Sequence, residues 1–87
     1  MKIVAKPIEM IAWFTRDGVP NPIRFRIMEE QKALKVINVD KIVFREKEKI
    51  AGCPAIIFNC QSNINGAEKL YQLKYQMDTC KWILFKI

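Results

Sequence analysis

Basic residues and large aromatic residues recur together along this chain, and side chains of these two kinds can bind nucleic acid. Lys and Arg neutralise phosphate charge, and exposed rings stack on bases, as in small barrels that bind single strands. Arg24 and Arg26 occupy alternate positions of one short run. The sequence therefore predicts a nucleic-acid-binding face built from these residues: Arg24, Arg26, Lys35, Lys74, Trp13, Tyr75 and Trp82.

Each of these side chains also has a plainer structural interpretation. Large rings in a small domain usually pack in the core, and charged residues at outward strand positions form a solvated face. Arg24 and Arg26 could also pair across strands with a carboxylate such as Glu29, Glu68 or Asp40. Basic residues that converge beside exposed rings would favour nucleic acid, whereas scattered ones would favour a protein partner or a homodimer.

The charge balance is compatible with both interpretations. The 87 residues include 15 Lys and Arg against 9 Asp and Glu, which gives a net charge of +6. Such an excess favours anionic partners and also keeps a protein soluble. The basic residues are spread from Lys2 to Lys86 and form no basic tract, which weakens the case for nucleic acid.

Residues for catalysis are scarce. The chain has no histidine, Ser62 is its single serine, and no glycine-rich phosphate loop is present. The usual acid–base and nucleophile constellations are therefore missing, and we expect a non-enzymatic protein without a cofactor or catalytic residue.

The cysteines suggest reduced thiols. The chain has three cysteines, Cys53, Cys60 and Cys80, and no CxxC motif. We therefore expect neither a zinc site nor a set of disulfide bonds. Cys53 lies between Gly52 and Pro54, where a loop thiol could react, whereas Cys60 fits the core and Cys80 a turn. The start of the chain lacks the apolar run of a signal peptide, and no stretch reaches the roughly 20 apolar residues of a membrane helix. We therefore expect a cytoplasmic protein with no membrane contact.

Alternating residues and turn signals predict strands. In the run 23–27, Ile23, Phe25 and Ile27 should point inward and both arginines outward. In the run 55–62, apolar and polar residues alternate in the same way. Asn65-Gly66 is a strong hairpin signal, since both residues tolerate positive φ. The last run, 82–87, is apolar on both faces and should close a barrel or be covered twice.

Two stretches also fit a helix. Residues 28–36 contain good helix formers, and residues 67–77 place several side chains at helical spacing. For 67–77 we favour a strand, because tyrosines alternate beside the Asn-Gly turn. The prediction is a single domain over residues 1–87. Its fold is all-β, a small antiparallel barrel or strongly twisted sheet of five to six strands, with α+β as the alternative.

Several short motifs occur in a fixed order: Trp13-Phe14-Thr15-x-Asp17-Gly18, Pro22-Ile23-Arg24-Phe25-Arg26-Ile27, Lys35-Val36-Ile37-x-Val39, Tyr71-x-Leu73-Lys74-Tyr75 and Trp82-x-Leu84-x-x-Ile87. Together they resemble a group of small bacterial β proteins of unknown function, some of which are fused to relatives of DNA damage-tolerance polymerases. The resemblance spans residues 8–87. The chain departs from it in having few arginines, a longer charged insert at 45–49, and Gln72 where an acid is common. The resemblance implies an association with DNA and assigns no catalytic residue.

Overall fold

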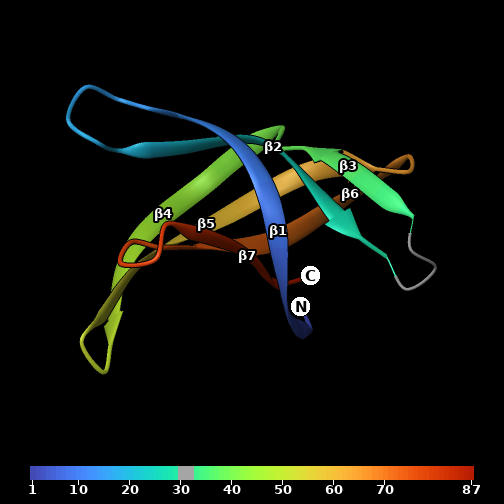
Figure 1. Ribbon diagram of the computed structural model, residues 1–87. Helices are drawn as coiled ribbons and strands as arrows, with labels where there is room; N and C mark the ends of the chain where they lie inside the picture. Colours follow the sequence, from blue (N-terminus) through green and yellow to red (C-terminus); the bar gives the residue numbers. More distant parts are fainter. Residues whose placement is uncertain (30–32) are drawn as a thin grey trace.

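The computed structural model describes residues 1–29 and 33–87, which form strands joined by turns and loops. The strands are β1 (Ile3–Phe14), β2 (Pro20–Met28), β3 (Leu34–Asn38), β4 (Lys41–Ile50), β5 (Cys53–Ile64), β6 (Ala67–Gln76) and β7 (Lys81–Lys86). They make one antiparallel seven-stranded sheet in the order β3-β2-β1-β7-β6-β5-β4 (Figure 1). The all-β prediction is confirmed, with seven strands in place of five to six. No helix in the described residues is long and apolar enough to cross a membrane.

The sheet curls into a half-barrel because β1 changes its partner midway. Residues Ile3 to Ile8 pair with β7, whereas Glu9 to Phe14 pair with β2. Register shifts in both pairings add the local bend and twist that β-bulges produce. The result is two facing layers, one formed by β2, β3 and the second half of β1, the other by β4 to β7 and the start of β1 (Figure 1).

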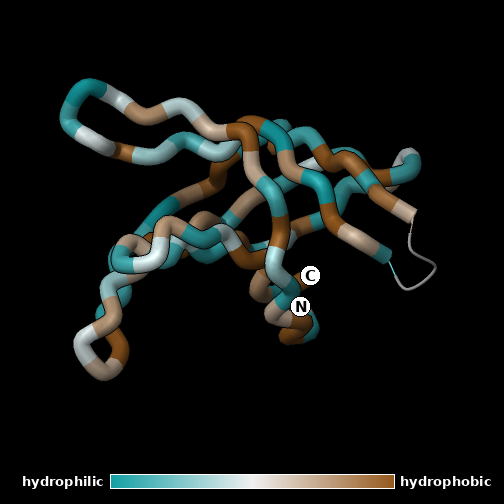
Figure 2. Tube along the Cα trace, in the orientation of Figure 1, coloured by the Kyte–Doolittle hydropathy of each residue, from teal (hydrophilic) through white to brown (hydrophobic). Residues whose placement is uncertain are grey.

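The core lies between these layers and takes side chains from both. Hydrophobic and hydrophilic residues alternate along much of the strand trace (Figure 2), which is the period-two pattern of strands with one buried face. The rings of Phe25 in one layer and Tyr71 in the other lie 5.8 Å apart. The buried cluster comprises Phe25, Ile27, Ile37, Ile56, Phe58, Cys60, Tyr71, Leu73, Tyr75, Trp82 and Leu84.

A buried hydroxyl joins the layers where β3 ends and β4 begins. Ser62 of β5 is fully buried, and its Oγ donates to the carbonyl oxygen of Asn38 at 2.7 Å. Ser62 Oγ also accepts a hydrogen bond from the Asp40 N–H at 3.2 Å and lies 2.6 Å from the Tyr71 hydroxyl oxygen. Since the Ser62 proton is engaged by Asn38, the Tyr71 hydroxyl donates to Ser62. The Asp40 carboxylate in turn accepts a hydrogen bond from the Asn63 N–H at 2.8 Å. These bonds attach the connection between β3 and β4 to β5.

Residues 67–77 adopt the favoured strand conformation over most of their length, since β6 spans Ala67–Gln76. The preceding turn has positive φ at Asn65 (54°) and Gly66 (84°), as the Asn-Gly signal predicts. For residues 28–36, the helical alternative fails at both ends, because Met28 lies in β2 and Leu34 begins β3. Residues 30–32 of that alternative lie outside the described residues.

The inward position predicted for Ile23 is wrong, although Phe25 and Ile27 are buried as expected. The register between β1 and β2 shifts between Ile11 and Ala12, so that Ile11 pairs with Arg24 but Ala12 pairs with Pro22. Pro22 therefore takes the buried position, and Ile23, the extra residue, remains 45% exposed.

Ionisation of Tyr71 should weaken the fold at alkaline pH. Burial raises the pKa of Tyr71 to about 12. An unfolded tyrosine titrates near pH 10. The stability linked to this shift is therefore complete below about pH 10 and is lost as the pH rises toward 12. We expect Tyr71→Phe to show a shallower fall of unfolding free energy over this range, measured by urea denaturation at several pH values.

Both proteins in this comparison should carry Cys60→Ala. Burial also raises the pKa of the Cys60 thiol to about 12, and that thiol would add its own alkaline loss. If the unfolding free energy fell equally steeply with pH in the proteins with and without the Tyr71 hydroxyl, the burial of a neutral Tyr71 side chain would be contradicted.

Candidate binding face

The structure brings Trp13, Arg24 and Arg26 to one surface. Cross-strand pairing aligns Arg26 with Glu9 on one side and Val36 on the other. These side chains point away from the core, because the residues that alternate with them are buried. We call this surface the outer face, and it consists of Glu9, Ile11, Trp13, Arg24, Arg26, Met28, Leu34 and Val36.

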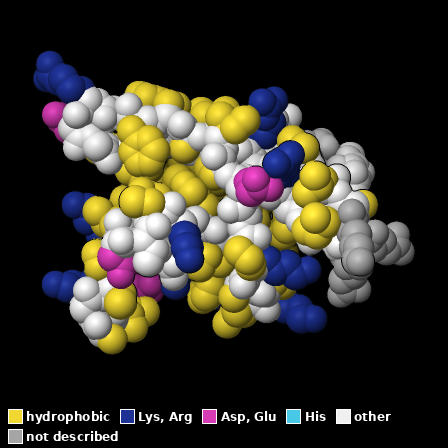
Figure 3. All heavy atoms as spheres, in the orientation of Figure 1, with side chains coloured by type: hydrophobic (Ala, Val, Ile, Leu, Met, Phe, Trp, Pro, Cys, Tyr) yellow, Lys and Arg dark blue, Asp and Glu magenta, His cyan; other side chains and the backbone are white. Residues whose placement is uncertain are grey.

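Large apolar side chains dominate the outer face. Its five large apolar residues are between 51% and 58% exposed: Ile11, Trp13, Met28, Leu34 and Val36. Hydrophobic side chains also gather on the surface in Figure 3, while Lys and Arg are scattered around that view. Several large apolar side chains exposed on one face are typical of an interaction surface.

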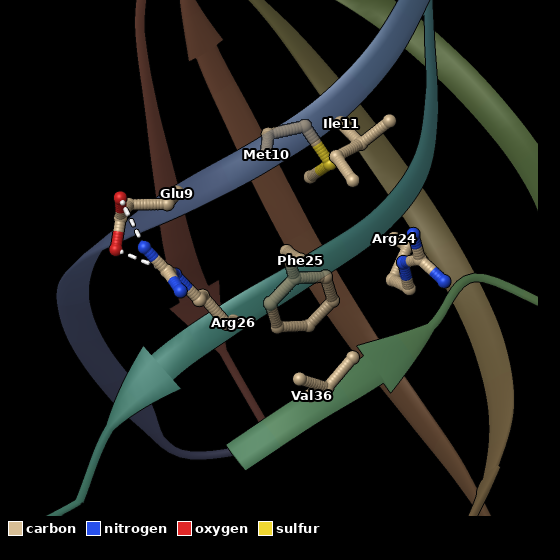
Figure 4. A pocket seen from close by; sticks show the side chains of 7 residues that line it. All are labelled: Glu9, Met10, Ile11, Arg24, Phe25, Arg26 and Val36. Carbon is tan, nitrogen blue, oxygen red and sulfur yellow. Dashed lines mark hydrogen bonds and ion pairs between the residues drawn. The ribbon is translucent and has the colours of Figure 1, made fainter. Parts of the chain in front are cut away.

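The charges on the outer face are partly neutralised. Arg26 donates from Nε and Nη2 to the two carboxylate oxygens of Glu9, at 2.8 and 3.1 Å. This hydrogen bonding, together with the guanidinium charge, lowers the pKa of Glu9 below its ordinary value. Among the described residues no carboxylate forms an ion pair with Arg24. Figure 4 shows Arg26 turned toward Glu9 and Arg24 lying apart from that pair.

A shallow depression of about 490 Å³ lies on this face. Ile11 and Arg24 line one side of it, and the Glu9–Arg26 pair lines the other (Figure 4). A group that enters this depression would contact the Arg24 guanidinium beside the apolar side chain of Ile11. This combination suits a carboxylate or another anion carried on an apolar segment.

Lys35 and Lys74 do not join the arginines, which corrects the predicted grouping. Lys35 pairs across the sheet with the buried residue Ile27, so it lies on the inner side of β3, and its ammonium is 3.8 Å from the carboxylate of Glu29. Lys74 lies on β6 in the other layer. It forms an ion pair of 3.2 Å with Glu48 and lies over the Phe85 ring at 4.1 Å.

Tyr75 and Trp82 pack in the core, which removes them from the predicted stacking surface. They are only 9% and 8% exposed, and their ring centroids lie 4.7 Å apart. They pair with each other across β6 and β7 on the buried side of the sheet. Of the predicted rings, only Trp13 is open to a partner, at 53% exposure.

Glu9 and Ile11 contribute to the face, although neither belongs to the binding face predicted from the sequence. Their signal is present in the hairpin around Asp17-Gly18. Folding the chain back at this turn places Glu9, Ile11 and Trp13, which are spaced by two, beside the strand that carries the arginines. The bulge after Ile11 shifts this register by one residue, so the pairing could not be counted from the turn alone.

The three thiols differ in exposure, with Cys53 and Cys80 exposed and Cys60 buried. Cys60 is therefore a core residue as expected. Burial raises its pKa, which is the direction opposite to that of an activated nucleophile.

No family model, curated protein or solved structure gives a significant match to this chain.

Alkylation should separate the cysteines. We expect a maleimide reagent to modify Cys53 and Cys80 in the native protein and to reach Cys60 only after unfolding, as read by peptide mass spectrometry. In a folded Cys60→Ala variant, the reagent should modify Cys53 and Cys80 to the same extent as in the wild type. Alkylation of Cys60 in the folded protein at the rate of the other two would contradict its burial.

Proposed function

We propose that this protein is a non-catalytic binding module that binds a protein partner through the outer face. The observation that carries the proposal is the composition of that face, which combines half-exposed apolar side chains with Arg24, a cation beside Ile11 that forms no ion pair among the described residues. Tryptophan and arginine are the residue types that dominate binding energy at protein interfaces. The complementary partner is an apolar surface that carries one carboxylate for Arg24.

The arrangement of charge favours protein over nucleic acid. A phosphate backbone needs several cations along its path, but Arg26 is engaged by Glu9, whose carboxylate would repel phosphate. Lys35 and Lys74 have their own carboxylate partners elsewhere. Branched and flexible aliphatic side chains, such as Ile11, offer no flat ring for a base to stack on.

Nucleic acid is the second candidate, and one observation favours it. Trp13 and Arg24 are both exposed on the outer face, so a base could stack on the indole while a phosphate meets the guanidinium. The net charge of +6 would aid the approach of a polyanion.

Site-specific photo-crosslinking in cells that produce this protein tests the proposal. A photoreactive amino acid is placed at Ile11, and at Leu70 as the control. Leu70 lies on β6 and is 59% exposed, close to the 56% of Ile11. We expect discrete protein adducts from position 11 and none from position 70. Adding Arg24→Glu to the position-11 protein should reduce the adducts about tenfold or more, because a buried interfacial charge pair typically costs 2–5 kcal/mol to break.

The identity of the adducts decides between the candidates. Equal protein adducts from positions 11 and 70, or none from position 11, would contradict a protein-binding outer face. Adducts that disappear on nuclease treatment would instead support nucleic acid. In that case, salt-sensitive binding of labelled single strands should be lost in both Trp13→Ser and Arg24→Glu.

A further inference from the structure

The sheet has two outer edges, and the chain protects them unequally. β3 and β4 are the terminal strands of the sheet order. Residues 45–49 of β4 alternate in charge, Arg-Glu-Lys-Glu-Lys, which is a common defence of an edge strand against pairing with another chain. β3 has the sequence Leu-Lys-Val-Ile-Asn, and its side chains on the outer face are uncharged.

Hydrogen-bond parity shows which backbone groups of β3 face outward. The Val39 N–H donates to the Ile23 carbonyl at 2.8 Å, and the Glu29 N–H donates to the Ala33 carbonyl at 2.9 Å. In an antiparallel ladder every second residue bonds to the same neighbour. Residues 33, 35, 37 and 39 therefore bond to β2, and the N–H and C=O groups of Leu34 and Val36 point away from it.

The position of Asn38 agrees with this parity. Its carbonyl oxygen leaves the ladder and accepts from Ser62 of β5. At Leu34 and Val36 no described strand lies beside β3 on that side. Their side chains are 51% and 58% exposed on the outer face. The one charged side chain of β3, Lys35, lies on the opposite side and pairs with Glu29.

We propose that β3 pairs edge to edge with β3 of a second copy of this chain, in an antiparallel dimer with two-fold symmetry. The axis passes by Val36, so that Val36 of each copy exchanges N–H···O=C bonds with its counterpart. Leu34 of each copy lies opposite Asn38 of the other. This inference rests on the backbone of β3 and does not depend on the proposed function.

A second copy suits this edge better than an unrelated strand does. The register is self-complementary, as a two-fold interface requires. The pairing satisfies the outward N–H and C=O groups of Val36 in both chains at once, while the Asn38 carbonyl keeps its bond from Ser62. It places no like charges opposite each other on the outer face. It also makes the two outer faces continuous across the axis. Because the contact is one short strand pair, we expect a transient dimer with a dissociation constant of roughly 10 µM to 1 mM.

Amide hydrogen exchange at low and high protein concentration tests this pairing at single residues. The Lys35 and Ile37 amides bond to β2 and should be protected at both concentrations. The Val36 amide should exchange quickly in dilute protein and slow by about tenfold or more in concentrated protein. Sedimentation velocity over the same range should show monomer passing into dimer.

Matched variants locate the interface. Val36→Lys places two ammonium groups at the two-fold axis and should keep the protein monomeric throughout. Val43→Lys makes the same change on β4, the other edge, where Val43 is 48% exposed; it should leave the dimer intact. Circular dichroism should show that both variants fold.

Three results would overturn the inference: a monomer at every concentration, a dimer in which the Val36 amide stays unprotected, and equal loss of the dimer in both variants. None of them bears on photo-crosslinking from Ile11, so the edge pairing and the protein-binding outer face can fail separately.

Discussion

The hydroxyl of Ser62 is the polar contact that holds the two layers of this half-barrel closed over the core. It is fully buried, and a buried hydroxyl without partners would cost roughly 1–3 kcal/mol. Its bonds to Asn38, Asp40 and Tyr71 satisfy it and hold the end of β3 and the start of β4 against β5. Since β3 has no other sheet neighbour than β2 among the described strands, this contact anchors the far end of the smaller layer over the core.

The outer face and the free edge of β3 follow from that closure. Phe25, Ile27 and Ile37 point inward against the larger layer, so the residues that alternate with them must point outward. An amphipathic strand would place polar groups there, but these strands carry apolar residues on that side as well. The exposed apolar side chains therefore lie on the layer formed by β2, β3 and the second half of β1. The inner side chains of this layer pack in the core and fix its position. Arg24 and Arg26 lie on this largely apolar outer face, and the charge of Arg26 is neutralised by its ion pair with Glu9.

Local signals predicted the strands well, and non-local pairing limited the prediction of the site. The Asn65-Gly66 turn, the alternation along β5 and the outward arginines of β2 follow from backbone preference and period-two burial, which a single segment encodes. The burial of Tyr75 and Trp82, the bulge that exposes Ile23 and the Glu9–Arg26 pair depend on register between strands, which no segment encodes alone. Lys35 was misplaced for a related reason, since its face is set by pairing with Ile27.

A double-mutant cycle on Ser62→Ala and Tyr71→Phe measures whether the two buried hydroxyls stabilise the fold together. Unfolding free energies of the wild type, the two single variants and the double variant give the coupling between the two hydroxyls. If the two hydroxyls hold the β3–β4 corner as one network, the two losses should be non-additive by about 0.5–3 kcal/mol. Losses that add to within about 0.3–0.5 kcal/mol would show that the two hydroxyls act independently, and would contradict a shared polar contact at the β3–β4 corner.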